Sequence, residues 1–290
     1  MSRMLLPWWL MLTTALFPGV SAQAFDLDGL LKQIDETGKD LETGLDKLDK
    51  MRGKVSAEDE IEIGGNLVSG LLGAAPLVDD PQLQRYVNDV GFWVAAQSKR
   101  KDLPWRFGVI QSNGINAFAA PGGYVVVTLG LYQLLENEAQ LAAVLAHEIA
   151  HVVRKHHLTA LQKTMKREFW SELAVDVVDD GKDRESLRKL IGSGLKLYTT
   201  GLDRSYEFDA DLRGVVLAAR AGYDPYAFLD VLTTIDSINP GSPELSVLLN
   251  THPPSAERLD QLAAKMDGRL DSYATGAINA NRFRQVGVGR

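Results

Sequence analysis

The sequence contains no cysteine among its 290 residues. This absence excludes disulfide bonds, cysteine-ligated zinc and lipid attachment through a cysteine, so the protein is not expected to be a lipoprotein. Any metal ion would have to be held by histidines and carboxylates.

Positive charge is in the minority. The chain has 31 Lys and Arg against 38 Asp and Glu, a formal net charge of −7. Its basic runs, such as residues 99–101, are short, and we therefore expect no nucleic-acid partner. With 45% apolar and 24% charged residues, the composition is that of an ordinary globular protein.

Long hydrophobic runs are also scarce, and the most apolar segment lies at the N-terminus. Arg3 precedes an apolar stretch from Met4 to Leu16, and Ala22-Gln23-Ala24 has the small-x-small pattern of a signal-peptidase site. A membrane anchor is the alternative, but the apolar stretch is short for a bilayer span. We therefore predict a cleavable signal peptide over residues 1–24, export from the cytoplasm, and a mature chain that is soluble or peripheral to a membrane.

The rest of the chain divides into three parts. In residues 25–55, leucines recur at spacings of three and four, which predicts an amphipathic helix from Asp26 to about Arg52. Its apolar stripe would pack on the main domain, although a partner helix or a membrane surface is an alternative. We place the main domain at residues 56–270 and a C-terminal tail at residues 271–290.

The main domain is predicted to be mainly helical α+β with one short sheet. Ser56, Asp80 and Asn137 are placed to cap helices. In the helix that follows Asp80, Trp93 has the spacing of a core residue. A period of two predicts strands over Trp105–Gln111 and Tyr124–Thr128, with a tight turn at 121–123. The edge of this sheet is either a binding site for an extended peptide or purely structural.

Residues 146–151, AHEIAH, carry an HExxH signature inside a helical stretch. Residues four apart share one face of a helix, so His147 and His151 can bind one zinc ion. Glu148 lies beside the first histidine and is placed to act as general base on the water at the open zinc position. The alternative is a polar helix face with two histidines by chance. We expect His156 and His157, which follow the motif, at the surface.

Residues 204–211, RSYEFDAD, are the candidate source of a third ligand. Glu207 and Asp211 share a helix face, one to bind the metal and one to orient a ligand histidine. His252 precedes two prolines, which hold it on a rigid turn. It would stabilise an oxyanion, occupy the open zinc position in a resting state, or be purely structural.

Taken together, HEIAH, RSYEFDAD and THPPSAERL resemble the M48 family of zinc metallopeptidases, and NAFAAPGGYVVVTLGLYQLL is similar to that family's pattern. The resemblance covers roughly residues 56–266. It points to the secreted bacterial branch, the periplasmic proteases linked to outer-membrane protein quality control. It implies a zincin-like fold in which His147, His151 and Glu207 hold one zinc ion and Glu148 is the catalytic base.

The same resemblance implies roles for four further positions. Asp211 falls on the acid that orients a ligand, and His252 on a histidine close to the metal and assigned to the catalytic site. Arg204 matches an arginine near the site. Asp209 stands where the family often has Glu. This change puts the assignment of the third metal ligand little in doubt, because the matched ligand is Glu207.

The function that the resemblance implies is a zinc endopeptidase that cleaves misfolded cell-envelope polypeptides in the periplasm. Contact with a membrane surface or with assembly machinery would fit this role. The alternative is a gated, chaperone-like binding module in which His252 blocks the metal. A structural zinc protein is disfavoured, because structural zinc sites usually have four protein ligands.

Overall fold

The computed structural model describes residues 55–173, 201–252 and 255–286. The predicted signal peptide and the whole of the predicted N-terminal helix lie outside these residues. Within the described ranges, every helix is too short or too polar to cross a bilayer. The elements, in chain order, are α3 (Ala57–Ala74), α4 (Pro81–Ala95), β1 (Arg106–Ile110), β2 (Ala117–Ala120), β3 (Tyr124–Thr128), α5 (Leu129–Leu134), α6 (Glu138–Arg154), α7 (His156–Leu173), α9 (Arg204–Arg220), α10 (Ala227–Asp236), η2 (Pro243–Leu245), α11 (Ser246–Thr251), α12 (Ser255–Met266), η3 (Asp271–Tyr273) and α13 (Ala280–Gln285).

The predicted class, mainly helical α+β with one short sheet, is confirmed. The sheet is mixed, in the order β1-β3-β2, with β1 parallel and β2 antiparallel to β3. Sequence periodicity identified β1 and β3 but not β2, which is only four residues long. The tight turn lies between β2 and β3, where Gly122 and Gly123 adopt φ angles of 79° and 101° that favour glycine.

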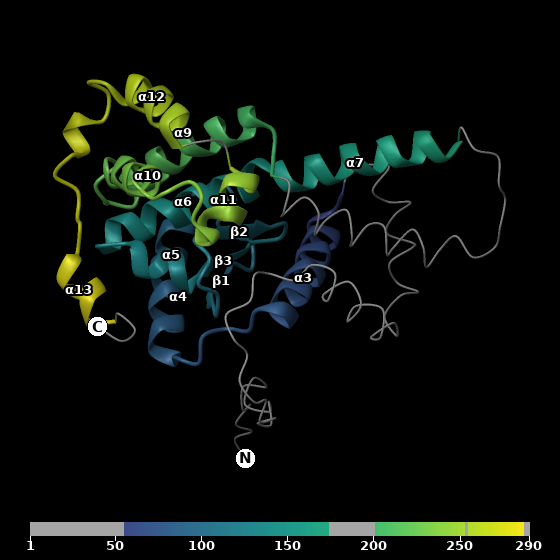
Figure 1. Ribbon diagram of the computed structural model, residues 1–290, viewed down its shortest axis with the longest axis horizontal. Coiled ribbons are helices and arrows are strands. Elements are labelled where there is room, and N and C mark those ends of the chain that lie inside the picture. Colours follow the sequence, from purple (N-terminus) through teal and green to yellow (C-terminus); the bar gives the residue numbers. More distant parts are fainter. Residues whose placement is uncertain (1–54, 174–200, 253–254, 287–290) are drawn as a thin grey trace, which may run out of the picture.

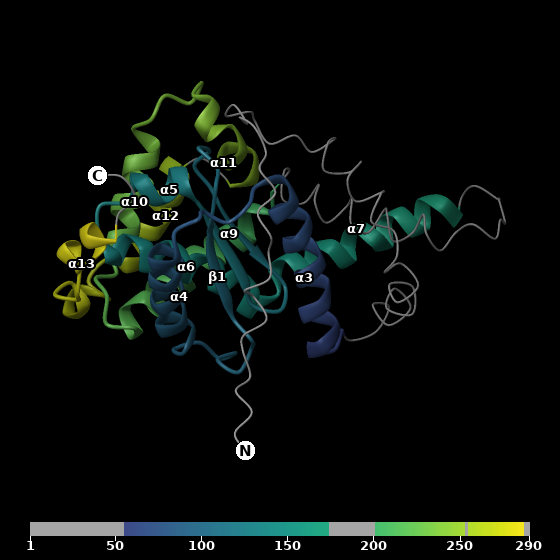
Figure 2. The same cartoon turned by 90° about the horizontal axis from the view of Figure 1, so that it is seen from below.

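Alternate side chains of the sheet enter two different layers. Ile110 and Val126 pack with Leu71 of α3. Their strand neighbours Val109 and Val127 belong to the main core, which includes α4 and α6. Because successive side chains of a strand point to opposite faces, the sheet has α3 on one side and α4 and α6 on the other (Figures 1 and 2).

Helix α6 runs through the centre of the domain, and every residue from Glu138 to Val152 is buried. Asn137 caps it as predicted, accepting a hydrogen bond from the backbone N–H of Gln140 at 3.0 Å. The sequence of α6 contains five alanines, whose small side chains let neighbouring elements come close on several sides. Helix α7 follows and extends away from the body of the domain (Figures 1 and 2).

The segment predicted as a C-terminal tail contributes to the core. Phe283 of α13 is 1% exposed and packs against Tyr132 at a ring-centroid distance of 5.0 Å. Asn279 Nδ2 donates to Glu138 at 2.7 Å, which ties this segment to the first turn of α6. The residues after 270 are therefore packed onto the domain as far as the structure describes them.

Trp93 differs from its prediction as a core residue, because its side chain is 57% exposed. Its indole N–H donates to the carbonyl of Ala221 at 2.7 Å, just after the end of α9. Tyr86, on the same helix, is buried as expected. An indole has a polar N–H on an apolar ring, and here the hydrogen bond holds it at the edge of the domain rather than inside it.

A buried carboxylate, Glu60, joins four parts of the fold. Arg100 donates to its two oxygens at 2.6 and 2.9 Å, and Lys155 lies 2.7 Å away. The backbone N–H of Gly122 donates to it at 3.3 Å. Burial alone would raise the pKa of Glu60, but Arg100 and Lys155 outweigh burial and hold it below its ordinary value of 4.5.

Replacing Glu60 with glutamine is expected to lower the free energy of unfolding by about 1.5–3 kcal/mol at neutral pH, the usual size for hydrogen bonds to charged groups. Because the folded state lowers the pKa, this contribution is complete above the pKa of the unfolded chain and is lost as pH falls through the folded value. Urea unfolding at pH 7 and at pH 3 measures both effects. Glu58→Gln, an exposed change in the same helix, is the control, and an equal loss in both variants would contradict the prediction.

Candidate metal centre

The two motif histidines face each other on α6. Nε2 of His147 lies 3.1 Å from Nε2 of His151. Both side chains are almost fully buried, at 3% and 1% exposure. This is the shared helix face that the spacing predicts.

Glu207 of α9 brings a carboxylate to the same point. Its Oε2 lies 3.6 Å from Nε2 of His147, and its Oε1 lies 3.5 Å from Nε2 of His151. Two ligands about 2.0–2.1 Å from a tetrahedral zinc ion are about 3.3 Å apart. These three side chains therefore have the spacing that a shared metal ion requires.

The polar atoms of the centre also favour a bound cation. Oε1 of Glu207 is buried and receives no hydrogen bond from the residues that the structure describes. Such an oxygen costs free energy unless a positive group satisfies it. The donor set of imidazole and carboxylate suits zinc, so the residues fit the ion that the sequence predicts.

Asp211 contacts His147 on the side of the ring away from the candidate metal position. Its Oδ1 lies 2.9 Å from Nδ1 of His147, the ring nitrogen opposite the candidate metal position. Arg258 of α12 in turn binds Asp211 through Nε and Nη2, at 2.9 and 2.5 Å. A carboxylate in this position fixes the tautomer and orientation of a ligand histidine. Arg258 was not singled out from the sequence, although it stands in the THPPSAERL motif.

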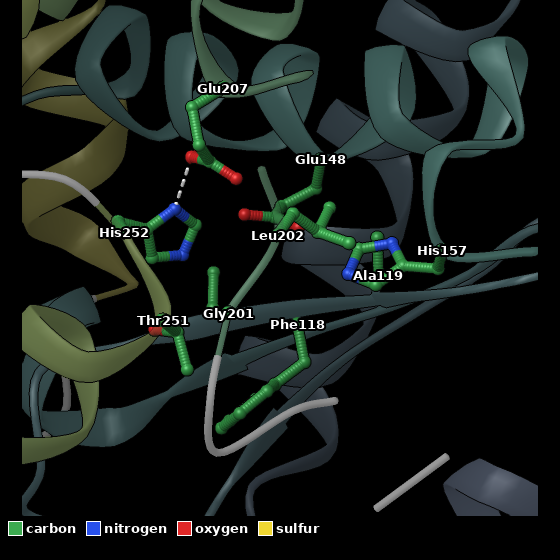
Figure 3. Close-up of a pocket in the computed structure, with 10 residues that line it drawn as sticks. Phe118, Ala119, Glu148, His157, Gly201, Leu202, Glu207, Thr251 and His252 are labelled. Carbon is green, nitrogen blue, oxygen red and sulfur yellow. Dashed lines mark hydrogen bonds and ion pairs between the residues drawn. The ribbon is translucent and has the colours of Figure 1, made fainter. Parts of the chain in front are cut away.

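His252 and Glu148 complete the cavity. His252 follows α11, and its Nδ1 lies 2.5 Å from Oε2 of Glu207. Ligand atoms of His147, Glu207 and His252 all lie within 4.8 Å of one another. Glu148 points into the cavity between Glu207 and the residues of β2 (Figure 3).

Burial and neighbouring charge set the protonation of these groups. Burial holds the pKa of His151 well below its ordinary value, so this imidazole is neutral, the form that binds metals. Burial also lowers the pKa of His147, but contacts with Asp211 and Glu207 outweigh it and raise the pKa to about 9. The centre therefore attracts positive charge beside Glu207. Burial raises the pKa of Glu148.

Three predicted positions lie elsewhere than expected. One is His157, expected at the surface, which instead lines the cavity that contains Glu148 (Figure 3), with its ring centroid 5.2 Å from that of His151. Arg204 is 66% exposed and pairs with Glu257 at 2.9 Å, and the buried arginine next to the metal-site residues is Arg258. His156, expected at the surface, is 4% exposed, and its Nδ1 lies 3.2 Å from Nδ1 of His151. Lys155 has a left-handed φ of 57°, which ends α6 and turns His156 back toward it. A continuous helix would have pointed His156 elsewhere.

The sequence profile of peptidase family M48 matches residues 80–266, which include all the residues of the centre. The chain belongs to peptidase family M48. The predicted resemblance is thereby confirmed, and the match supports a metalloprotease.

Named relatives agree with the family. This M48 chain is 32% identical over 213 residues to the beta-barrel assembly-enhancing protease of Escherichia coli K12, over 71% of this chain and 43% of that protein. It is 29% identical over 239 residues to the protein of the same name in Yersinia pestis, over 81% of this chain and 49% of that protein. The mitochondrial metalloendopeptidase OMA1 of Schizosaccharomyces pombe is 32% identical over 177 residues, 61% of this chain and 51% of that protein. The chain thus spans about half the length of these relatives or less.

Gly214 allows α9 to approach α6 closely. A Cβ atom at this position would lie 2.9 Å from the backbone N and Cα of His147, closer than such contacts allow. Only a glycine therefore lets α9 bring Glu207 and Asp211 up to the histidines of this M48 centre.

Gly214→Ala is expected to force the two helices apart and to destabilise the fold by about 1–3 kcal/mol, the usual cost of overpacking. Zinc affinity should fall with it, because Glu207 and Asp211 move away from the histidines. Urea unfolding and a zinc titration measure the two effects. Gly65→Ala is the matched control, since its Cβ would meet only the end of the Tyr124 side chain, at 3.3 Å. Unchanged zinc affinity in Gly214→Ala would contradict the prediction.

Proposed function

We propose that the chain is a zinc endopeptidase in which His147, His151 and Glu207 hold one zinc ion and Glu148 is the general base. The observation that carries the proposal is the spacing of 3.1–3.6 Å between the ligand atoms of the three residues. Glu148 opens onto the same cavity as Glu207. The family supports a metalloprotease.

The chemistry divides between the ion and the side chains. Zinc, when bound, supplies Lewis acidity that polarises a carbonyl and makes a water molecule more acidic. Glu148 takes a proton from the attacking water and delivers it to the amine that leaves when the peptide bond breaks. Burial raises the pKa of Glu148, which strengthens it as a proton acceptor. Asp211, held by Arg258, keeps His147 in its ligand orientation.

We place the substrate beside β2, as an extended polypeptide. Residues Ala117–Ala119 of this outermost strand line the cavity that contains Glu148. A second cavity adjoins Glu148 and is lined mainly by apolar side chains, among them Val144, Phe228, Val231 and Ile235. An unfolded chain presents both an extended backbone and exposed apolar side chains, which favours misfolded proteins as substrates.

The cellular setting is proposed from the sequence and from the relatives. The signal-peptide pattern of residues 1–24 suggests export, and the bacterial relatives are named beta-barrel assembly-enhancing proteases. We therefore propose that the chain acts in the periplasm on envelope polypeptides, with outer-membrane proteins among them.

Glu148→Gln is expected to lower proteolysis of an unfolded test protein by about 10²–10⁴-fold, the usual contribution of a general base. The variant should still bind zinc, because Glu148 is not one of the proposed ligands. Cleavage assays and zinc content, measured on the purified chain, test both statements. Glu136→Gln, an exposed change just before α6, is the matched control. Full activity of the Glu148→Gln variant with zinc bound would refute the assigned base.

A second candidate function is a gated protease that acts mainly as a binding module. The contact of 2.5 Å between His252 and Glu207 favours it, because His252 is then close enough to complete the metal coordination and block access. His252 follows the six-residue helix α11 and precedes two prolines, so it belongs to a segment separate from the two long helices of the centre.

If His252 blocks the centre, His252→Ala should raise proteolysis by about tenfold or more, since a hydrogen bond to a charged group contributes about 1.5–3 kcal/mol. Initial cleavage rates of the zinc-loaded variant measure this. Leu249→Ala, an exposed position on the same short helix, serves as control. An unchanged or lower rate would exclude gating and assign His252 to catalysis or structure.

A further inference from the structure

All five histidines of the chain lie in one cluster. His156 is the least expected member, because its ring is buried between two aromatic neighbours. Its ring lies edge-on to His151 at a centroid distance of 5.1 Å and is stacked on Tyr206 of α9 at 4.6 Å. Nothing assigned so far to the centre uses this residue.

The two ring nitrogens of His156 face two different groups. Nδ1 lies 3.2 Å from Nδ1 of His151, and Nε2 lies 3.4 Å from Oδ2 of Asp209. Asp209 is itself held by Arg154 at 3.0 Å and by Arg213 at 2.7 and 2.8 Å. The carboxylate therefore has a fixed position and remains ionised, so it accepts hydrogen bonds and does not donate.

The charge of Asp209 decides where the protons lie. A carboxylate accepts, so the proton of a neutral His156 is on Nε2. Nδ1 of His156 then carries a lone pair and accepts from Nδ1–H of His151. That leaves Nε2 of His151 with its lone pair directed at His147 and Glu207. The opposite arrangement would place a proton on Nε2 of His151 and prevent it from binding a metal.

We propose that His156 is the positioning residue of His151, and that Asp209 selects its tautomer. This inference rests on the proposed metal site and adds to it. The arrangement matches that of His147, which Asp211 holds directly, but it uses an imidazole between the carboxylate and the ligand. Helix α9 thus supplies both orienting carboxylates, one to each motif histidine.

The fold explains why an intermediate residue is needed. Asp209 lies two residues before Asp211 on α9, so the two carboxylates point to different sides of that helix. Asp211 reaches His147 directly. His156, returned toward α6 by the left-handed Lys155, bridges Asp209 to His151. The stacked ring of Tyr206, whose hydroxyl accepts from Lys163 at 2.8 Å, holds the imidazole plane.

The test compares two substitutions of His156. His156→Phe keeps an aromatic ring for stacking on Tyr206 but removes the acceptor. His156→Asn loses the ring but places an amide oxygen where Nδ1 of the histidine stood, so His151 keeps its acceptor. A purely structural role would favour the phenylalanine, whereas an orienting role favours the asparagine.

Zinc affinity, measured by competition with a chelator, is the first readout. His156→Phe is expected to weaken binding by about 10- to 100-fold, the usual effect of losing a partner that orients a ligand, and His156→Asn by much less. A third variant, Asp209→Asn, removes the charge that selects the tautomer of His156. Its charge control is Asp236→Asn, an exposed change at the end of α10. Equal affinity of His156→Phe and the wild-type chain would overturn the proposal.

The second readout is independent of zinc and of activity. Ring-nitrogen NMR of the metal-free chain reports which nitrogen of His151 carries the proton. We expect Nδ1–H in the wild type and a mixture of both tautomers in Asp209→Asn, with no change in Asp236→Asn. Nε2–H in the wild type would overturn the proposal. If the wild type bound no zinc, the proposed protease function would fail, while this readout would still decide the role of His156.

Discussion

The contact between α6 and α9 is the constraint on which the rest of the structure depends. Three carboxylates, Glu148, Glu207 and Asp211, are buried where these helices meet, with the histidines between them. Buried carboxylates are costly unless positive or hydrogen-bonding partners surround them. Gly214 makes the necessary approach of the two backbones possible. Asp211 is paired with Arg258, and Glu207 lies against His147 and His252. The oxygen of Glu207 that no described residue satisfies is the place where a cation adds most.

Both ends of α6 are held by buried acids. At its start, Glu138 accepts hydrogen bonds from Tyr86, Tyr223 and Asn279 at 2.7–2.9 Å. At its end, Arg100, itself paired with Glu60, donates to the carbonyl of Val152 at 3.1 Å. Fixing both ends of the helix also fixes the positions of its two motif histidines. A preorganised centre loses little conformational entropy on binding.

The residues of the centre stand on two kinds of element, long buried helices and one short segment. His147, Glu148, His151, Glu207 and Asp211 stand on long buried helices, whereas His252 follows a helix of six residues. Groups on rigid elements suit metal binding and proton transfer, which need fixed distances. His252, which stands on a short segment outside these long helices, is the natural candidate for controlling access to the metal position.

The sequence alone determined the parts of the centre whose geometry is local. Spacing within one helix placed His147, Glu148 and His151 together, and the same rule placed Glu207 and Asp211 on one face. Alternation predicted β1 and β3, and the predicted caps Ser56, Asp80 and Asn137 each accept a backbone hydrogen bond at the start of a helix. These features depend only on the period of a helix or strand and on hydrogen bonds between residues close in the chain.

Tertiary structure alone decided the partners that are distant in the chain. It selected Arg258 rather than Arg204 as the arginine beside Asp211, although both stand in recognisable motifs. It also turned His156 inward through a single left-handed residue at the end of α6 and left Trp93 at the surface. No periodicity encodes these outcomes, because they depend on which helices meet and at what distance. Local pattern supplies the candidate ligands, and the packing of α6 against α9 and α12 decides which residues hold them in place.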